Sequence, residues 1–357
     1  MEQASSLAGT PGTNAANGKA AWLPLVALFC GVATVAFIVY FVGFDAILQP
    51  LARVGWGFFW IVTLNGARHF LRAINLVVAL PRRERTFSVA EAFAARLAGE
   101  TINTVAFTGP VLGDAAKAAM MNRKVKLEHS ATAVIVDEIV YYISSLVLIL
   151  AGAVAILSAY GAGLAVRLML AGLVVFSFGV FCGLWWVLRR EIKPIAWAIR
   201  KCRDRWFVPK YVRKRRDQIC EVETNVMLFK DDRPRAFRII VFLVIAAHFL
   251  SVVEAYVGMR LLGLDATAFN AFIVESLTKA LNFTFFLIPG TVGAYEGGNG
   301  VILSLLGYTA GAGVALALVR RGAILFWTFI GGLVLLWRGA ESTAEQIAES
   351  GGPAGSE

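Results

Sequence analysis

The stretch Phe285–Gly298, FFLIPGTVGAYEGG, constrains the fold most, because it interrupts a hydrophobic segment in its middle. A helix does not run cleanly through Pro289-Gly290, since proline lacks an amide hydrogen and glycine readily leaves the helical conformation. The flanks, 268–288 and 301–337, are still apolar enough for a bilayer. Lipid cannot satisfy the free backbone groups of such a break, so the break must be buried in protein or line a cavity. We therefore predict a binding site here.

Composition places this break in a helical membrane protein. The chain is 58% hydrophobic and 16% charged, whereas soluble domains carry about 25% charged residues. We expect an all-α polytopic membrane bundle, with disordered tails at 1–21 and 338–357 and a single membrane domain at 22–337. Apolar runs predict helices at about Trp22–Gly43, Trp56–Leu80, Thr132–Leu157, Leu164–Leu188, Ile239–Leu262 and Gly313–Trp337.

The net charge of +10 is concentrated in a basic loop at 189–238. Nucleic-acid binding is one interpretation; we favour a cytoplasmic loop on an anionic leaflet, because short cytoplasmic loops of membrane proteins are enriched in Lys and Arg. We thus expect a multi-pass protein of the bacterial-type inner membrane, with both termini cytoplasmic and no nucleic-acid partner. Three histidines and four cysteines form no ligand pattern, so we expect no metal and no cofactor.

An internal repeat relates the two halves of the chain. An offset of 179 residues aligns Ile61–Pro110 with Ile240–Pro289 and matches His-Phe-Leu, Asn and Pro in one register. The first repeat covers about 55–188 and the second about 239–337. The first aligned helix runs toward the basic cluster Arg82–Arg85, whereas its equivalent starts from the basic loop, so we expect inverted repeats. Inverted repeats with interrupted helices are typical of transporters with a central site.

The repeat predicts two broken hairpins that enter the membrane from opposite faces. Gly109-Pro110 is the expected break in the first hairpin, which we assign to the cytoplasmic side. Pro289-Gly290 is its counterpart in the second, assigned to the outer side. The register also aligns charges of opposite sign, Arg96 with Glu275 and Glu100 with Lys279. We predict that these four side chains meet near the middle of the membrane.

Charges inside an apolar bundle require partners or water, because an isolated charge costs roughly 2.5–3.5 kcal/mol at the centre of a membrane helix. We interpret them as a substrate-binding site; a purely structural lattice of ion pairs is the alternative. The candidate binding residues are Arg96, Glu100, Asn103, Asp114, Glu138, Glu275, Lys279, Asn282, Glu296, Arg320 and Arg321.

Several motifs resemble a known family. They are LAGETINTVAFTGPVLGDAAKAAMM at Leu97–Met121, VDEIVYY at Val136–Tyr142, IPGTVGAYEG at Ile288–Gly297 and the Arg320-Arg321 pair. The chain resembles the transmembrane region of lysylphosphatidylglycerol synthases and related flippase-like proteins, including the hopanoid-associated branch. It departs from the usual Pro-Gly-Gly of that family at Thr291, and from the usual proline-arginine-glycine-glutamate turn near Asp114. With no soluble aminoacyl-transfer domain in the sequence, the resemblance implies lipid translocation rather than aminoacylation.

Three functions fit these observations. The first is a lipid flippase or transporter for a phospholipid, a polyprenyl-phosphate-linked lipid or a hopanoid-type lipid, in which Arg and Lys bind a phosphate-bearing head group. The second is a non-catalytic accessory protein that holds lipid-synthesis partners through the basic loop. The third is a head-group transferase with an acidic general base, which no nucleophile or metal motif supports. We expect a flippase and no enzymatic activity.

Overall fold

The computed structural model describes residues 52–105, 110–122, 124–159, 164–190, 216–285 and 293–350. The predicted first helix, residues Gly109, Pro289 and Gly290, and much of the basic loop lie outside them. The described residues form helices and no strand, so the predicted all-α class is confirmed. In chain order the elements are η1 (Gly55–Gly57), α3 (Phe58–Ala79), η2 (Arg82–Glu84), α4 (Val89–Val105), α5 (Pro110–Met121), α6 (Leu127–Ala159), α7 (Leu164–Arg189), α10 (Arg216–Asp232), α11 (Pro234–Leu261), α12 (Ala268–Thr284), α13 (Ala294–Leu305) and α14 (Ala310–Ser350).

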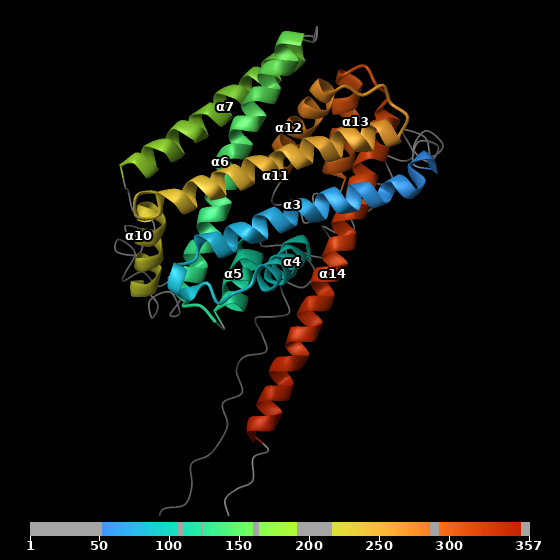
Figure 1. Ribbon diagram of the computed structural model, residues 1–357. Coiled ribbons are helices and arrows are strands. Elements are labelled where there is room, and N and C mark those ends of the chain that lie inside the picture. Colours follow the sequence, from blue (N-terminus) through green and yellow to red (C-terminus); the bar gives the residue numbers. More distant parts are fainter. Residues whose placement is uncertain are drawn as a thin grey trace, which may run out of the picture.

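Helices α3 and α11 lie side by side and antiparallel through the middle of the bundle (Figure 1). Asn65 of α3 donates to Glu254 of α11 at 3.4 Å. One turn further along α3, Arg68 donates to Ser251 at 2.7 Å, which is earlier in α11. The pairing therefore runs in opposite directions along the two helices. Since α3 and α11 are equivalent in the repeat, their opposed directions agree with the predicted inversion.

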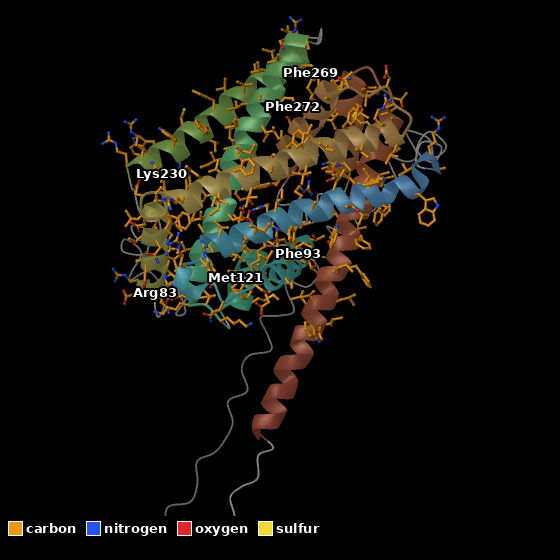
Figure 2. The ribbon with its side chains drawn as sticks, in the orientation of Figure 1. Arg83, Phe93, Met121, Lys230, Phe269 and Phe272 are labelled. Carbon is orange, nitrogen blue, oxygen red and sulfur yellow. The ribbon has the colours of Figure 1, made fainter. Side chains whose placement is uncertain are left out.

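Each repeat contains a helical hairpin, α4–α5 in the first and α12–α13 in the second, and the two open toward opposite ends of the bundle. Lys124, after α5, binds Glu91 in the first turn of α4 at 2.6 Å. At the other end, Asn270 at the start of α12 donates to Tyr308 after α13 at 2.8 Å. In Figure 2, Arg83 lies at the lower left, beside α10 and near the open end of the first hairpin. Phe269 lies at the top, above α11 and near the open end of the second hairpin.

The long helices α6 and α14 each pack on the hairpin of the other repeat. Gly152 of α6 lies against Ser276 of α12, and Gly331 of α14 lies against Leu97 and Thr101 of α4. A side chain at either glycine would overlap these neighbours, so glycine permits the close approach. Thr101 also donates to the carbonyl of Thr328 at 2.8 Å. The two repeats are thus interlocked, not merely adjacent.

Buried apolar side chains form two separate cores. One lies where α3 begins and α11 ends, and it includes Ile61, Met259 and Leu316. The other lies where α3 ends and α11 begins, and it includes Leu76 and Ile240. The middle of α3 and α11 lies between them. This middle layer holds the buried charges.

Three of the described helices are long and apolar enough to cross a membrane: α6, α11 and the 310–337 part of α14. Helices α5 and α13 have 12 residues each, about 18 Å at 1.5 Å per residue. The apolar part of a bilayer is about 30 Å thick. Neither short helix therefore spans a bilayer alone.

The structure corrects several predicted boundaries. Helix α6 begins at Leu127 rather than Thr132, and α11 begins at Pro234, where proline suits the first helical position. Helix α14 continues to Ser350, so 338–350 are helical and do not belong to the predicted disordered tail. This segment is rich in Ala and Glu, which favour helix, and the glycines at 351–352 follow it. Within the predicted basic loop, 216–232 form helix α10.

Candidate functional site

A layer of charged side chains lies between the two apolar cores and divides into two clusters. The first cluster belongs mainly to the first repeat and comprises Arg72, Arg96, Glu100, Asp114, Lys117, Asp137 and Glu138. The second cluster comprises Arg68, Glu254, Glu275, Lys279, Glu296, Arg320 and Arg321. Helix α3 contributes to both clusters through Arg72 and Arg68, which are one turn apart.

Asp137 of α6 and Lys117 of α5 organise the first cluster. Asp137 accepts from Arg72 at 2.6 Å and from Arg96 at 3.3 Å. It also accepts from the amide of Asn75 at 2.8 Å. Asp137 is thereby held by α3 and α4 at once. The predicted need for charge partners is met by direct ion pairs.

Lys117 binds three carboxylates. Its Nζ lies 3.0 Å from Glu100, 2.9 Å from Asp114 and 3.2 Å from Glu138. The lysine side chain is 1% exposed, whereas that of Glu100 is 31% exposed. The cation therefore lies beneath the carboxylates, and the accessible face of the first cluster is acidic.

Arg320 of α14 organises the second cluster. Its guanidinium binds Glu275 of α12 at 2.6 Å and Glu254 of α11 at 3.1 Å. Lys279 also binds Glu275, at 3.1 Å. Arg68 of α3 lies 3.5 Å from Glu254 and has a side chain 19% exposed against 1% for the glutamate. Here the carboxylates lie beneath and the accessible side chains are cations.

The adjacent pair Glu296 and Arg321 completes the second cluster. Glu296 of α13 accepts from Arg321 Nε, and its other oxygen accepts from the amide of Gly293 at 2.7 Å. Gly293 has a φ of 82°, a left-handed conformation that glycine adopts without strain. The backbone turn before α13 thus points an amide hydrogen at the buried carboxylate.

The two clusters are copies of each other with the signs of their charges reversed. The ion pair Arg96–Asp137 in the first repeat corresponds to Glu275–Arg320 in the second. Likewise, Lys117–Glu138 corresponds to Glu296–Arg321. The helical pair Arg96–Glu100 corresponds to Glu275–Lys279. Asn75, which binds Asp137, stands at the position equivalent to Glu254, which binds Arg320.

Tyr141 of α6 joins the clusters. Arg72 stacks over its ring, 4.0 Å from the centroid, and Lys279 donates to its hydroxyl at 3.3 Å. Arg96 and Glu100 therefore belong to one cluster, and Glu275 and Lys279 to the other. Among the contacts of the described residues, the four meet through Arg72 and Tyr141 rather than directly.

Two predicted amides have different positions. Asn103 of α4 accepts from the amide of Gly113 at 2.8 Å and so closes the α4–α5 hairpin. Asn282, its repeat equivalent, is exposed on α12 and belongs to neither cluster. Pro110 is the first residue of α5. The remaining predicted hairpin breaks, Gly109, Pro289 and Gly290, lie outside the described residues.

The predicted site omitted several residues that the structure brings into the layer. They are Arg68, Arg72, Lys117, Asp137, Tyr141, His248 and Glu254. The repeat register held a signal for some of them, because it aligns Lys117 with Glu296 and Asn75 with Glu254. The repeat register does not mark Tyr141; it lies in the motif Val136–Tyr142, but its role depends on how α6 crosses α12.

A small polar cavity and a larger apolar depression lie away from the clusters. The cavity, of about 40 Å³, lies near α10 and is lined by residues that include His129, Asp232 and Arg233. The depression, of about 420 Å³, lies on α14 beside Phe329. Neither is lined by a member of the charge clusters.

Comparison with known proteins gives one match. The sequence profile described as "Lysylphosphatidylglycerol synthase TM region" matches residues 25–332. This range includes every residue of the two charge clusters. Neither a curated protein nor a solved structure matches the chain.

Proposed function

Because the chain belongs to the lysylphosphatidylglycerol synthase transmembrane-region family, we propose that it is a lipid flippase or transporter and not an enzyme. Its substrate is a polar or phosphate-bearing lipid, of phospholipid, polyprenyl-phosphate-linked or hopanoid type. The lipid head group crosses the membrane between the two repeats. The protein lies in a bacterial-type inner membrane, with its termini and the basic end, near Arg83 and Lys230, on the cytoplasmic side.

The observation that carries this proposal is the buried layer of paired charges at the junction of two inverted repeats. Charges inside a membrane bundle are expensive and mark pathways for ions or polar substrates. A buried ion pair is weak evidence for stability, since well-packed apolar residues of similar volume often serve as well or better. The layer is therefore better explained by a polar substrate than by structural need.

The second cluster has the chemistry to bind a phosphate. Guanidinium groups bind phosphate oxygens in bidentate geometry, and Arg68 and Arg321 are its most accessible cations. Arg320 Nη1 is a buried donor with no acceptor among the described residues. A phosphate oxygen supplies such an acceptor.

The arrangement of the hairpins supports movement between leaflets. Hairpin α4–α5 opens at one end of the bundle and α12–α13 at the other, and each holds a set of charges near the middle. Movement of either hairpin relative to the other repeat would expose the charged layer to one side at a time. In the conformation described here Glu100 and Asp114, of the first hairpin, are the most exposed members of the layer.

Lipid movement by the purified protein tests the proposal. The protein is reconstituted into vesicles of phosphatidylethanolamine and phosphatidylglycerol that contain a fluorescent phosphatidylglycerol, and dithionite reports the probe in the outer leaflet. We expect the wild type to move the probe and Arg321→Met to slow it by about 10- to 150-fold. This factor in the transport rate corresponds to the loss of about 1.5–3 kcal/mol, the contribution of a charge-assisted hydrogen bond.

Arg260→Met is the matched control, because Arg260 forms an exposed pair with Asp265 at 3.4 Å outside the layer. It should move lipid at the wild-type rate. If the wild type moves neither this probe nor a polyprenyl-phosphate probe, the flippase proposal is wrong. The accessory function would then gain support if deletion of 191–215 abolished binding to partner proteins of lipid synthesis.

A further inference from the structure

His248 of α11 is a buried titratable group at the junction of the two charge clusters that the proposed lipid path does not use. The residue is 5% exposed. Its ring stacks on that of Tyr141, with centroids 4.9 Å apart. Nε2 lies 2.8 Å from the hydroxyl of Ser144 on α6. Nδ1 has no hydrogen-bond partner among the described residues.

The hydrogen bonds of Ser144 determine which nitrogen of His248 carries the proton. The serine hydroxyl has one hydrogen, and its oxygen lies 2.7 Å from the carbonyl of Val140, which is an acceptor only. The hydroxyl therefore donates to Val140 and accepts from His248. The neutral imidazole must carry its proton on Nε2. Nδ1 is then a bare lone pair, buried and able to accept a proton.

The charges around His248 oppose a second proton in this conformation. Helix α3 contributes Arg68 and Arg72, and α12 contributes Lys279. Glu275 of α12 provides the opposing carboxylate, but it is already bound by Arg320 of α14 and by Lys279. On α6, the neighbouring titratable group is Tyr141. Glu254 lies further along α11 and is bound by Arg68 and Arg320. The arrangement thus fits a neutral ring.

Protonation of His248 would disturb the contacts of Tyr141 that connect the two charge clusters. An imidazolium at this position would repel Arg72 and Lys279, the two cations that hold Tyr141 from opposite clusters. Movement of α3 and α12, which carry Arg72 and Lys279, away from α11 would relieve this repulsion. A ligand that binds one conformation better than another shifts the equilibrium toward it, and here the ligand is a proton.

We propose that His248 is the proton-binding site of a proton-coupled lipid transporter, with Nδ1 as the acceptor and Ser144 as the group that fixes the tautomer. This inference rests on the proposed function. The step is a reversible protonation: a proton from one side adds to Nδ1 and leaves to the other after the conformational change. It needs no other reactant.

Lipid transport under an imposed pH gradient tests the coupling. Proteoliposomes of phosphatidylethanolamine and phosphatidylglycerol hold a fluorescent phosphatidylglycerol, with the membrane potential clamped at zero by equal potassium and valinomycin. For one proton per lipid, we expect each pH unit to shift the leaflet ratio of the probe by about 10-fold. A protonophore should abolish the shift. A leaflet ratio unaffected by the gradient in the wild type would refute the coupling but not the transport.

His248→Gln is the decisive variant, because the Gln amide preserves a donor to Ser144 but accepts no proton. We expect it to lose the response to the gradient, while the matched control His129→Gln keeps the 10-fold shift. His129 binds Glu84 at 2.8 Å at the basic end. A full response in His248→Gln would overturn the assignment. Absence of lipid movement in every condition would refute transport and coupling together.

Nitrogen NMR of the wild-type protein provides a readout that does not depend on a variant folding. In histidine-labelled protein, His248 should show a neutral ring protonated at Nε2, with His129→Gln and His69→Gln samples used for assignment. Addition of phosphatidylglycerol at acidic pH should convert this signal to that of an imidazolium. A His248 ring protonated at Nδ1 in the lipid-free protein would contradict the proposed acceptor.

Discussion

Substitution of Lys117 by Met should destabilise the protein far more than the same substitution at the surface. Lys117 Nζ binds Glu100, Asp114 and Glu138 at 3.0, 2.9 and 3.2 Å. Methionine has a similar length and no charge, so packing is largely retained while three ion pairs are lost. The perturbation is therefore mainly electrostatic.

After Lys117→Met, the three carboxylates differ in the ion pairs that they retain. Glu100 still binds Arg96 at 3.2 Å, and Glu138 still binds Arg72 at 3.0 Å. Asp114 has no other ion pair among the described residues. Removal of one partner from a buried pair costs about 3–5 kcal/mol. Because Asp114 is 24% exposed and water screens part of its charge, we expect about 3 kcal/mol.

Lys124→Met is the matched control. Lys124 binds Glu91 at 2.6 Å, but its side chain is 52% exposed. Exposed pairs contribute about 0.2–1 kcal/mol. Equilibrium unfolding in mixed micelles, followed by tryptophan fluorescence, should then give a loss in unfolding free energy about threefold or more greater for Lys117→Met than for Lys124→Met.

A second substitution separates the electrostatic effect from loss of packing. Asp114→Asn in the Lys117→Met background removes the carboxylate that has lost its partner. The double variant should recover part of the stability, whereas Asp114→Asn alone should be destabilising. Comparison of the double variant with the two single variants gives the coupling energy between the two sites. Equal effects of Lys117→Met and Lys124→Met, or no coupling between residues 114 and 117, would refute the buried-pair argument.

Two further predictions concern the first hairpin. Gly113→Ala should cost about 1–3 kcal/mol, because its new Cβ would overlap the side chain of Asn103, whereas Gly172→Ala, with open space around it, should have little effect on thermal stability. Lys124, together with backbone and side-chain hydrogen bonds from Ser88, lowers the pKa of Glu91 to about 2 from 4.5. The stabilisation from this carboxylate is therefore present above about pH 4.5 and lost as the pH falls through 2, so the difference in melting temperature between wild type and Glu91→Gln should shrink over that range. A difference that grows on acidification would contradict this sign.

The sequence predicted the relation between the repeats better than the contacts between them. The match of His69 with His248 and the basic residues at opposite helix ends indicated two equivalent helices of opposite direction, which is the arrangement of α3 and α11. Buried charges were expected to pair, because membrane interiors do not tolerate isolated ones. Both inferences need only periodicity, charge and register.

The partners of those charges could not be predicted, because they depend on how helices cross. Arg96 was aligned with Glu275, but it binds Asp137 on α6, and Glu275 binds the equivalent Arg320 on α14. Register gives equivalence between halves, not contact. The interlocking of α6 with the second hairpin requires a close approach at Gly152 that no sequence pattern marks as special among 34 glycines.

The reversed signs of the two clusters have a consequence for what can bind between them. The first cluster has three cations and four carboxylates, and the second has four cations and three carboxylates, so they carry −1 and +1 and the layer is neutral. A neutral layer costs less to bury in a low-dielectric bundle than either cluster alone. A lipid phosphate that enters alone adds one negative charge and disturbs this balance. A proton on His248 adds one positive charge, so phosphate and proton together leave the layer neutral. Electroneutrality therefore favours movement of an anionic lipid and a proton in the same direction, and a transporter that exchanged them in opposite directions would contradict this argument.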